Sequence, residues 1–312
     1  MFPRSYFLLG LCLVFLSSKS RAQQAASSAI DQARLFQKTP AAPVASVDAN
    51  GNAISDGSDT SGDDSFGAQV ILKDQGKVRF FTLSAGAAAY YTNNVALTRR
   101  DERDDVFVIA GASGSWSRAL NPELEALVGL EASTFRYADN TPLDFDSFGG
   151  GFGLSWTPRR ANGLNFFGRY DFTELLNNDG NEILRDHELT FGGQKVFALG
   201  RSHAIALGLL GSIGISTPFA AQRDQVGPFL GYQLRLTRSL DTGVMYPLTY
   251  QIYTSGNRQD LNQVFSWNLR YHFNDWTEAD AYFSFGGNRS NASAFDYDVL
   301  SGGGGIGFST RF

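Results

Sequence analysis

The chain has 312 residues, a formal net charge of −5, and a composition that is 43% hydrophobic and 13% aromatic, with 34 glycines. Because nucleic-acid binding requires a basic surface, this acidic balance argues against nucleic acid as a partner. The only cysteine is Cys12. It lies in a leader that we expect to be removed, so the processed chain has no thiolate for zinc sites, iron–sulfur clusters or nucleophilic catalysis.

The first 22 residues have the pattern of a secretory signal peptide. Arg4 precedes an apolar run from Tyr6 to Leu16, and small residues at Ser20 and Ala22 suit signal peptidase. This run of about 11 residues is shorter than the roughly 20 that a membrane-spanning helix needs. We therefore expect residues 1–22 to be cleaved, which leaves 23 basic and 31 acidic residues.

Residues 23–77 are rich in small and polar side chains and contain few large apolar ones. Such a composition cannot bury enough apolar surface to offset chain entropy, so we expect a periplasmic, largely disordered segment. The spacing of Asp48, Asn50, Asn52 and Asp59 is weakly similar to a calcium-binding loop, but Ala53 stands where that loop needs glycine. A solvated linker is the better interpretation, and plugging of the following domain is an open alternative.

Residues 78–312 repeat a two-residue alternation of apolar and polar side chains between turn-forming residues. Runs of roughly ten residues with this period are typical of transmembrane β-barrel strands. The runs are 78–91, 105–117, 123–137, 145–157, 163–174, 186–198, 203–217, 224–237, 240–253, 261–273, 277–288 and 297–312. The sequence therefore predicts an all-β fold, a closed antiparallel transmembrane β-barrel of about 12 strands, an even number as is usual for such barrels.

The connections between runs alternate in length. Those at 118–122, 159–163, 200–202, 238–239 and 274–276 are short, and most of the intervening ones are longer. Outer-membrane barrels have short periplasmic turns and longer outer loops. We therefore expect both ends of the barrel chain on the periplasmic side.

The alternation also predicts which face of each strand meets lipid. In the tenth run, Leu261, Phe265, Trp267, Leu269, Tyr271 and Phe273 share one face, and Asn262, Ser266, Asn268, Arg270 and His272 share the other. Aromatic residues near the ends of runs indicate an interfacial girdle. Its predicted members are Trp116, Trp156 and Trp276 near the turns, and Tyr91, Tyr137, Tyr253 and Tyr297 near the outer loops.

The last run places Phe308 and Phe312 on one face and ends in an aromatic residue. In Gram-negative outer-membrane proteins such a strand carries the assembly signal, so the expected partners are outer-membrane lipid and the barrel assembly machinery. The expected location is the cell outer membrane.

One hairpin resembles a known family. The segment from Tyr91 to Val95 and the segment from Asp104 to Phe107 resemble the opening hairpin of the β-barrel porin type 2 family. The resemblance implies an outer-membrane barrel and supplies no catalytic or binding residues. Thr92 and Asn93 stand where that family often has aspartate, so no cation-related role of the hairpin is implied.

Charged residues on the polar faces are the candidate functional residues. Alternation assigns Glu125, Glu131, Arg169, Asp171, Glu188, Arg235, Asp241, Arg270 and Asp280 to the lumen. They favour either direct contact with polar solutes through a transverse field or structural ion pairs inside the wall, since Arg235 with Asp241, and Arg270 with Asp280, flank short turns. Arg169 and Asp171, in mid-strand, are the better constriction candidates.

Enzymatic interpretations have little support in the sequence. Asp186 and His187 are an acid and an imidazole side by side, but adjacent strand residues point to opposite faces. No pattern for a cofactor or metal site is present. The favoured function is a narrow, monomeric channel for small polar solutes; the alternative is a non-conducting barrel with a structural or export-associated role.

Overall fold

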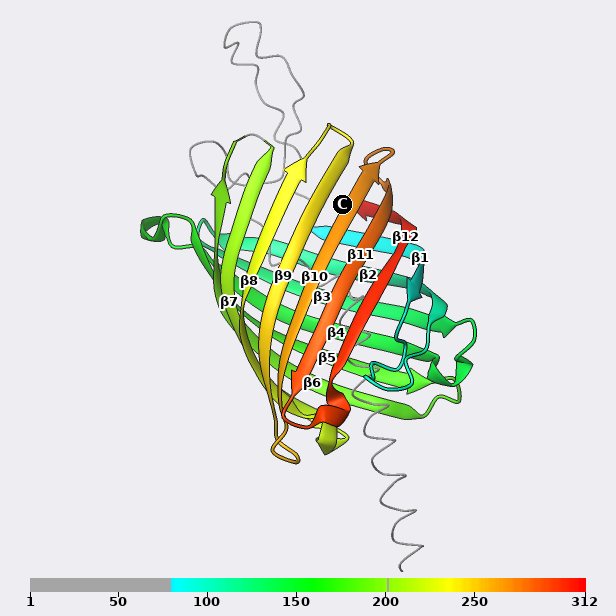
Figure 1. The fold of residues 1–312 in the computed structure, drawn as a ribbon. Coiled ribbons are helices and arrows are strands. Elements are labelled where there is room, and N and C mark those ends of the chain that lie inside the picture. The colour runs from blue at the N-terminus through cyan, green and yellow to red at the C-terminus, as the bar shows by residue number, and fades with distance from the viewer. Residues whose placement is uncertain (1–79, 201) are drawn as a thin grey trace, which may run out of the picture.

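The computed structural model describes residues 80–200 and 202–312, so the predicted signal peptide and the 23–77 segment lie outside the described residues. The described chain is a closed antiparallel β-barrel (Figure 1). The fold class predicted from the sequence is confirmed.

Twelve strands form the wall. They are β1 (Phe81–Thr92), β2 (Asp105–Asn121), β3 (Leu124–Tyr137), β4 (Phe145–Trp156), β5 (Leu164–Asn177), β6 (Glu182–Ala198), β7 (His203–Thr217), β8 (Arg223–Arg235), β9 (Leu240–Tyr253), β10 (Gln259–His272), β11 (Thr277–Ser290) and β12 (Tyr297–Arg311). Each predicted run corresponds to one strand, and the boundaries differ by at most four residues. Within the described part of the chain, no helix is long and apolar enough to cross a membrane.

Every strand pairs with its neighbours in sequence, and the seam between β1 and β12 closes the sheet (Figure 1). The seam runs from the Thr82–Arg311 pair to the Thr92–Ser301 pair. It is extended by reciprocal backbone hydrogen bonds of 3.0 Å between Phe81 and Phe312. Closure pairs β1 with β12, so neither of the terminal strands is left as a free edge, which is the condition for a sheet in lipid.

The two ends of the barrel differ in their connections. We call the end with the connections 122–123, 157–163, 199–202, 236–239 and 273–276 the turn end, and the opposite end the loop end. Loop-end connections have four to seven residues except 93–104, which has twelve. The predicted difference in length between the turns at one end and the loops at the other is therefore small, and it comes mainly from the 93–104 loop. Short 3-10 helices, η1 (Thr141–Leu143), η3 (Phe219–Ala221) and η4 (Ser293–Phe295), keep three of the loop-end connections compact, and η2 (Arg159–Ala161) lies at the turn end.

Candidate functional site: the barrel lumen

The two faces of each strand separate as the alternation predicts. On β10, Leu261, Trp267 and Tyr271 are exposed on the outer wall. Asn262, Asn268 and Arg270 lie on the opposite face, in register with inward residues of β9 and β11. On β10 the outer face is therefore apolar and the inner face mainly polar.

The predicted lumen residues all lie on the inner face. The set from β3, β5, β6, β8, β9, β10 and β11 is Glu125, Glu131, Arg169, Asp171, Glu188, Arg235, Asp241, Arg270 and Asp280. The residues opposite them on the neighbouring strands also face inward. The inward orientation of these nine residues therefore follows from the strand register alone.

Mid-lumen charges gather on β3 and β5, on either side of β4. The Nε atom of Arg169 lies 2.6 Å from Oδ2 of Asp171, two residues along the same strand. Glu131 leans across β4, where a Cβ added to Gly149 would lie 2.9 Å from its Oε1. Glycine at this position lets the carboxylate lie flat against the wall, because any larger residue would displace it.

At the turn end, charged side chains of β8 to β11 form one network. Arg235 pairs with Asp241 at 3.4 Å, as predicted, and Nε2 of His272 lies 3.1 Å from the same carboxylate. Arg270 is opposite Asp280 in register, and it forms an ion pair of 3.4 Å with Glu278. The prediction named the directly opposed residue, whereas the guanidinium reaches the diagonal one on the same face. Glu278 was not among the candidates, although the parity it shares with Asp280 places it in the lumen.

A chain of amide and carboxylate groups crosses the inner face from β6 to β9. Gln225 donates from Nε2 to Glu188 at 3.0 Å and to the hydroxyl of Ser212 at 3.3 Å. Gln251 donates to the Oε1 atom of Gln225 at 3.3 Å. Glu188 is thus held by an amide from β8, a partner that the sequence did not indicate.

Between these charged sectors, the inner wall of β12, β1 and β2 carries almost no side chains. Its residues at mid-height are Ser84, Gly86, Gly111, Ser113, Gly305, Gly307 and Ser309. Small residues on the lumen side leave space that long side chains would fill. The polar groups of β3 and β5 and those of β10 and β11 therefore border a sector with a bare wall.

At the loop end the inner side of the wall carries a buried apolar cluster that we call the apolar cap. It consists of Tyr90, Val95, Phe107, Phe135, Tyr137, Phe145, Leu175, Leu184 and Ala221. All are on the inner side and at most 8% exposed. Val95 reaches the cluster from the 93–104 loop, which thus folds back onto the barrel. The sequence predicted a wet interior, and it did not indicate this apolar cluster at the loop end.

Three girdle predictions were wrong for the same reason. Tyr137, Tyr253 and Tyr297 are buried on the inner side, each at most 4% exposed, whereas Tyr91 is 43% exposed on the outer wall. Tyr137 shares the parity of Glu131 on β3, so it points into the barrel. A tyrosine near a strand end therefore belongs to the girdle only if the strand alternation points its side chain outward. The turn-end tryptophans Trp156 and Trp276 are exposed, as predicted.

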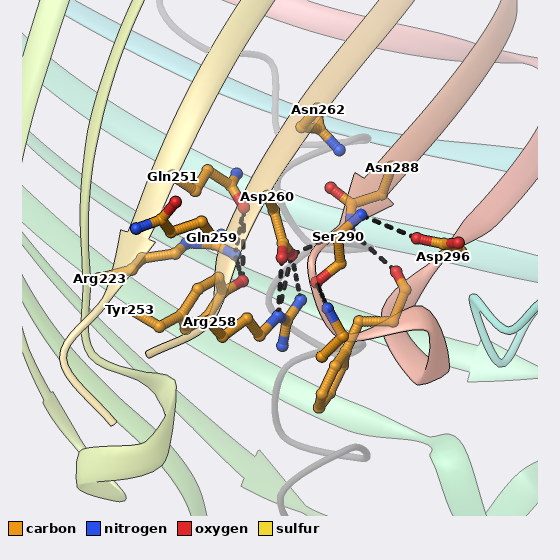
Figure 2. Close-up of polar contacts among 12 residues, drawn as sticks. Arg223, Gln251, Tyr253, Arg258, Gln259, Asp260, Asn262, Asn288, Ser290 and Asp296 are labelled. Atoms are coloured by element: carbon orange, nitrogen blue, oxygen red, sulfur yellow. Dashed lines mark hydrogen bonds and ion pairs between the residues drawn. The ribbon is translucent and has the colours of Figure 1, made fainter. Parts of the chain in front are cut away.

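Beside the apolar cap lies a polar cluster that we call the rim network: Arg223, Gln251, Tyr253, Arg258, Asp260 and Asn288 (Figure 2). Nε of Arg258 donates to both carboxylate oxygens of Asp260, at 3.0 and 2.9 Å. Arg223 donates to the hydroxyl of Tyr253 at 2.6 Å. The network joins β8, β9, β10 and β11 at the loop end and narrows the lumen there.

The acid and imidazole at Asp186 and His187 do not form a catalytic pair. Asp186 accepts a hydrogen bond of 2.6 Å from Ser216 on the inner side. His187 contacts the hydroxyl of Tyr170 at 2.7 Å on the outer side. The two side chains point to opposite faces, as the strand period predicts.

No family model and no curated protein matches the chain. Among solved structures, an outer membrane channel from Pseudomonas putida F1 is similar with a TM-score of 0.51 at 10% identity, over 75% of this chain and 96% of that one. An anion-selective porin from Comamonas acidovorans gives a TM-score of 0.40 at 9% identity, over 74% and 98%. The translocator domain of the autotransporter NalP from Neisseria meningitidis gives 0.43 at 9% identity, over 73% and 88%.

The similarity to the Pseudomonas channel is a similarity of fold: both chains form a β-barrel of the outer-membrane type. The resemblance of the opening hairpin to the β-barrel porin type 2 family is not confirmed, because no family model matches. In the structure the hairpin residues bind the seam instead: Asn93 accepts a hydrogen bond of 2.7 Å from the backbone of Leu300, and Asn94 donates to Asp298 O at 2.9 Å.

Proposed function

We propose that the chain is a narrow outer-membrane channel for small polar solutes, with its turn end in the periplasm. The observation that supports this function is the middle of the lumen, where charged groups from β3, β5, β10 and β11 border a wall of glycine and serine. A conduit for polar solutes needs such a lining of polar groups with space between them. Twelve strands enclose less room than the sixteen to eighteen of general porins, so only small solutes would pass.

The outer wall supports the membrane location. Outward apolar residues on β1 extend from Phe81 to Tyr91, which is about 34 Å at ~3.4 Å per residue. With the strand tilt of roughly 35–45° in transmembrane barrels, this is about 25 Å along the membrane normal, the height of their apolar band. Lipid is therefore the proposed partner of the outer wall.

The outward position of two C-terminal phenylalanines supports their proposed role in the assembly signal. Phe308 and Phe312 are 49% and 59% exposed on the outer wall. Phe312 stacks on Phe81 of the first strand with ring centroids 5.8 Å apart. We assign these two rings to recognition by the assembly machinery, before β1 closes against β12.

The channel is tested by electrical recording from purified, refolded protein in planar bilayers. We expect stepwise openings of uniform size. Silence from protein whose folding has been verified by its compact migration before heating would contradict the proposal. It would favour the alternative of a non-conducting structural or export-associated barrel, for which the buried apolar cap is the specific support.

Replacing Arg169 with alanine is expected to change ion selectivity. The substitution leaves the carboxylates of Asp171 and Glu131 without the mid-lumen guanidinium, so the reversal potential in a salt gradient should shift toward cation preference. Arg136→Ala is the matched control, because Arg136 pairs with Asp146 at 2.6 Å on the outer face. Unchanged conductance and selectivity in Arg169→Ala would remove this residue from the solute pathway.

A further inference from the structure

An apolar hollow of about 690 Å³ lies on the outer wall, toward the turn end. Its floor is made of small residues on β1, β2 and β3: Ala85, Ala112, Gly114 and Ala132. Its rims are large: Leu83, Leu130, Phe308 and Trp276. The rim side chains are 49–69% exposed on the outward face, which places the hollow on the outer side of the wall. Four residues whose side chains point inward also border it: Ser84, Ser113, Glu131 and Ser309.

The register of two hairpins and of the β1–β12 seam explains why the wall is hollow here. Ala85 is opposite Ala112, and Ala112 is opposite Ala132, so three methyl groups form one row across three strands. On the other side Ala85 is opposite Phe308. The ring of Trp276, in the β10–β11 turn, stacks against Phe308 with centroids 6.1 Å apart and so raises that rim.

A cation lies at the turn-end side of the hollow. Arg118 is exposed and follows Ala112 and Gly114 on the outward face of β2. Its guanidinium lies 5.3 Å from the centroid of the Phe80 ring, which holds it at the end of the strand. Six residues separate Ala112 from Arg118, or about 20 Å along the strand.

With a strand tilt of roughly 35–45° this separation is about 15 Å along the membrane normal, which is half of the ~30 Å hydrocarbon core. If the row of alanines lies near the middle of the bilayer, Arg118 lies at the level of the headgroups. The hollow then faces acyl chains of a single leaflet. The apolar hollow matches the acyl part of a lipid, and the cation beyond it matches an anionic headgroup.

We propose that this hollow binds an acyl chain of one anionic glycerophospholipid in the turn-end leaflet, with the lipid phosphate on Arg118. A second copy of the chain fits the surface less well. A two-fold interface brings the same patch of both copies together, so two hollows would face each other and leave a void without van der Waals contacts. It would also bring the two Arg118 side chains onto one small interface.

The test is native mass spectrometry of protein refolded with phosphatidylglycerol or phosphatidylethanolamine and then stripped with detergent. The wild type should retain one phosphatidylglycerol. The double variant Ala85→Leu/Ala112→Leu fills the floor and should retain none. Ala281→Leu, on the outward face of β11 and outside the hollow, is the matched control and should retain the lipid. Equal retention by the filled variant and the control would overturn the proposal.

The headgroup contact has its own variant. Arg118→Gln should weaken phosphatidylglycerol retention about tenfold, the loss of roughly 1.4 kcal/mol, within the range of a charge-assisted hydrogen bond. It should weaken phosphatidylethanolamine retention less, because the ammonium of that headgroup offsets the phosphate charge. Arg238→Gln, an exposed cation in the β8–β9 turn, is the control. Unchanged retention in Arg118→Gln would overturn the headgroup assignment. A dimer of the wild type that Ala85→Leu/Ala112→Leu converts to a monomer would show that a second copy occupies the hollow.

A fluorescence measurement on the wild type tests the proposal even if the Ala85→Leu/Ala112→Leu variant fails to fold. Phosphatidylglycerol with brominated acyl chains should quench wild-type tryptophan fluorescence more than brominated phosphatidylcholine at the same mole fraction. The excess quenching should decrease in Trp276→Phe, because Trp276 forms one rim. Trp116, which lies between Gly114 and Arg118 on the outward face of β2, should account for the remainder. Equal quenching by the two lipids would contradict a site selective for anionic lipid. None of these readouts depends on conductance.

Discussion

Replacing Asp260 with alanine is expected to lower the free energy of unfolding by about 3–5 kcal/mol, the usual cost of breaking a buried ion pair by removing one partner. The side chains of Arg258 and Asp260 are 7% and 0% exposed. Without the carboxylate, the guanidinium stays in a dry site with its charge uncompensated. Desolvation of that charge, and not the lost contact alone, sets the size of the effect.

The surroundings of Arg258 prevent it from turning to solvent. Its guanidinium carbon lies 4.0 Å from the ring centroid of Tyr253 and 3.6 Å from that of Phe295, so two rings enclose it. Asn288 donates to Asp260 at 2.9 Å and to Phe295 O at 2.9 Å. Asp260 therefore links the β9–β10 loop to η4, and its loss should also loosen the loop end.

The matched control for Asp260→Ala is Asp298→Ala. Arg289 and Asp298 pair at 2.7 Å on the outer face, with side chains 54% and 52% exposed. An exposed pair contributes only about 0–1 kcal/mol. Urea titrations of both variants in lipid vesicles measure the difference. Equal losses would mean that solvent reaches the rim network and that Asp260 is not in a dry site.

The strand period was enough to predict the wall of this barrel. A period of two fixes the face of every residue once one residue of a strand is placed, so the position of Arg169, Asp171 and Asp280 in the lumen followed directly. The same rule, applied to Tyr137, Tyr253 and Tyr297, would have placed them inside. They were assigned to the girdle by nearness to the loops, which is the weaker signal.

Contacts between strands could not be predicted in the same way. Which inward residues meet depends on register and on the direction of each side chain. Arg270, for example, reaches the diagonal Glu278. The apolar cap joins residues of six strands, a loop and η3, which meet only once the barrel closes. The outer hollow depends on Ala85 and Phe308, which become neighbours only through the β1–β12 seam.

Phe145→Ala is expected both to destabilise the barrel and to enlarge the conductance. Phe145 is 1% exposed and stacks on Phe135 with ring centroids 4.3 Å apart and an interplanar angle of 17°. Truncation of a buried phenylalanine costs about 3–5 kcal/mol through lost burial and the cavity left behind. Because this ring points into the loop end of the lumen, the cavity opens where the apolar cap narrows the path.

Phe148→Ala on the same strand separates the two effects. Phe148 points outward and is 45% exposed, so its truncation removes apolar surface from the outer wall and leaves the cap intact. Urea unfolding and single-channel recording of both variants form one experiment. We expect lower stability and larger steps only in Phe145→Ala. A destabilised Phe145→Ala with wild-type steps would mean that ions bypass the cap along β7 to β12, past the rim network.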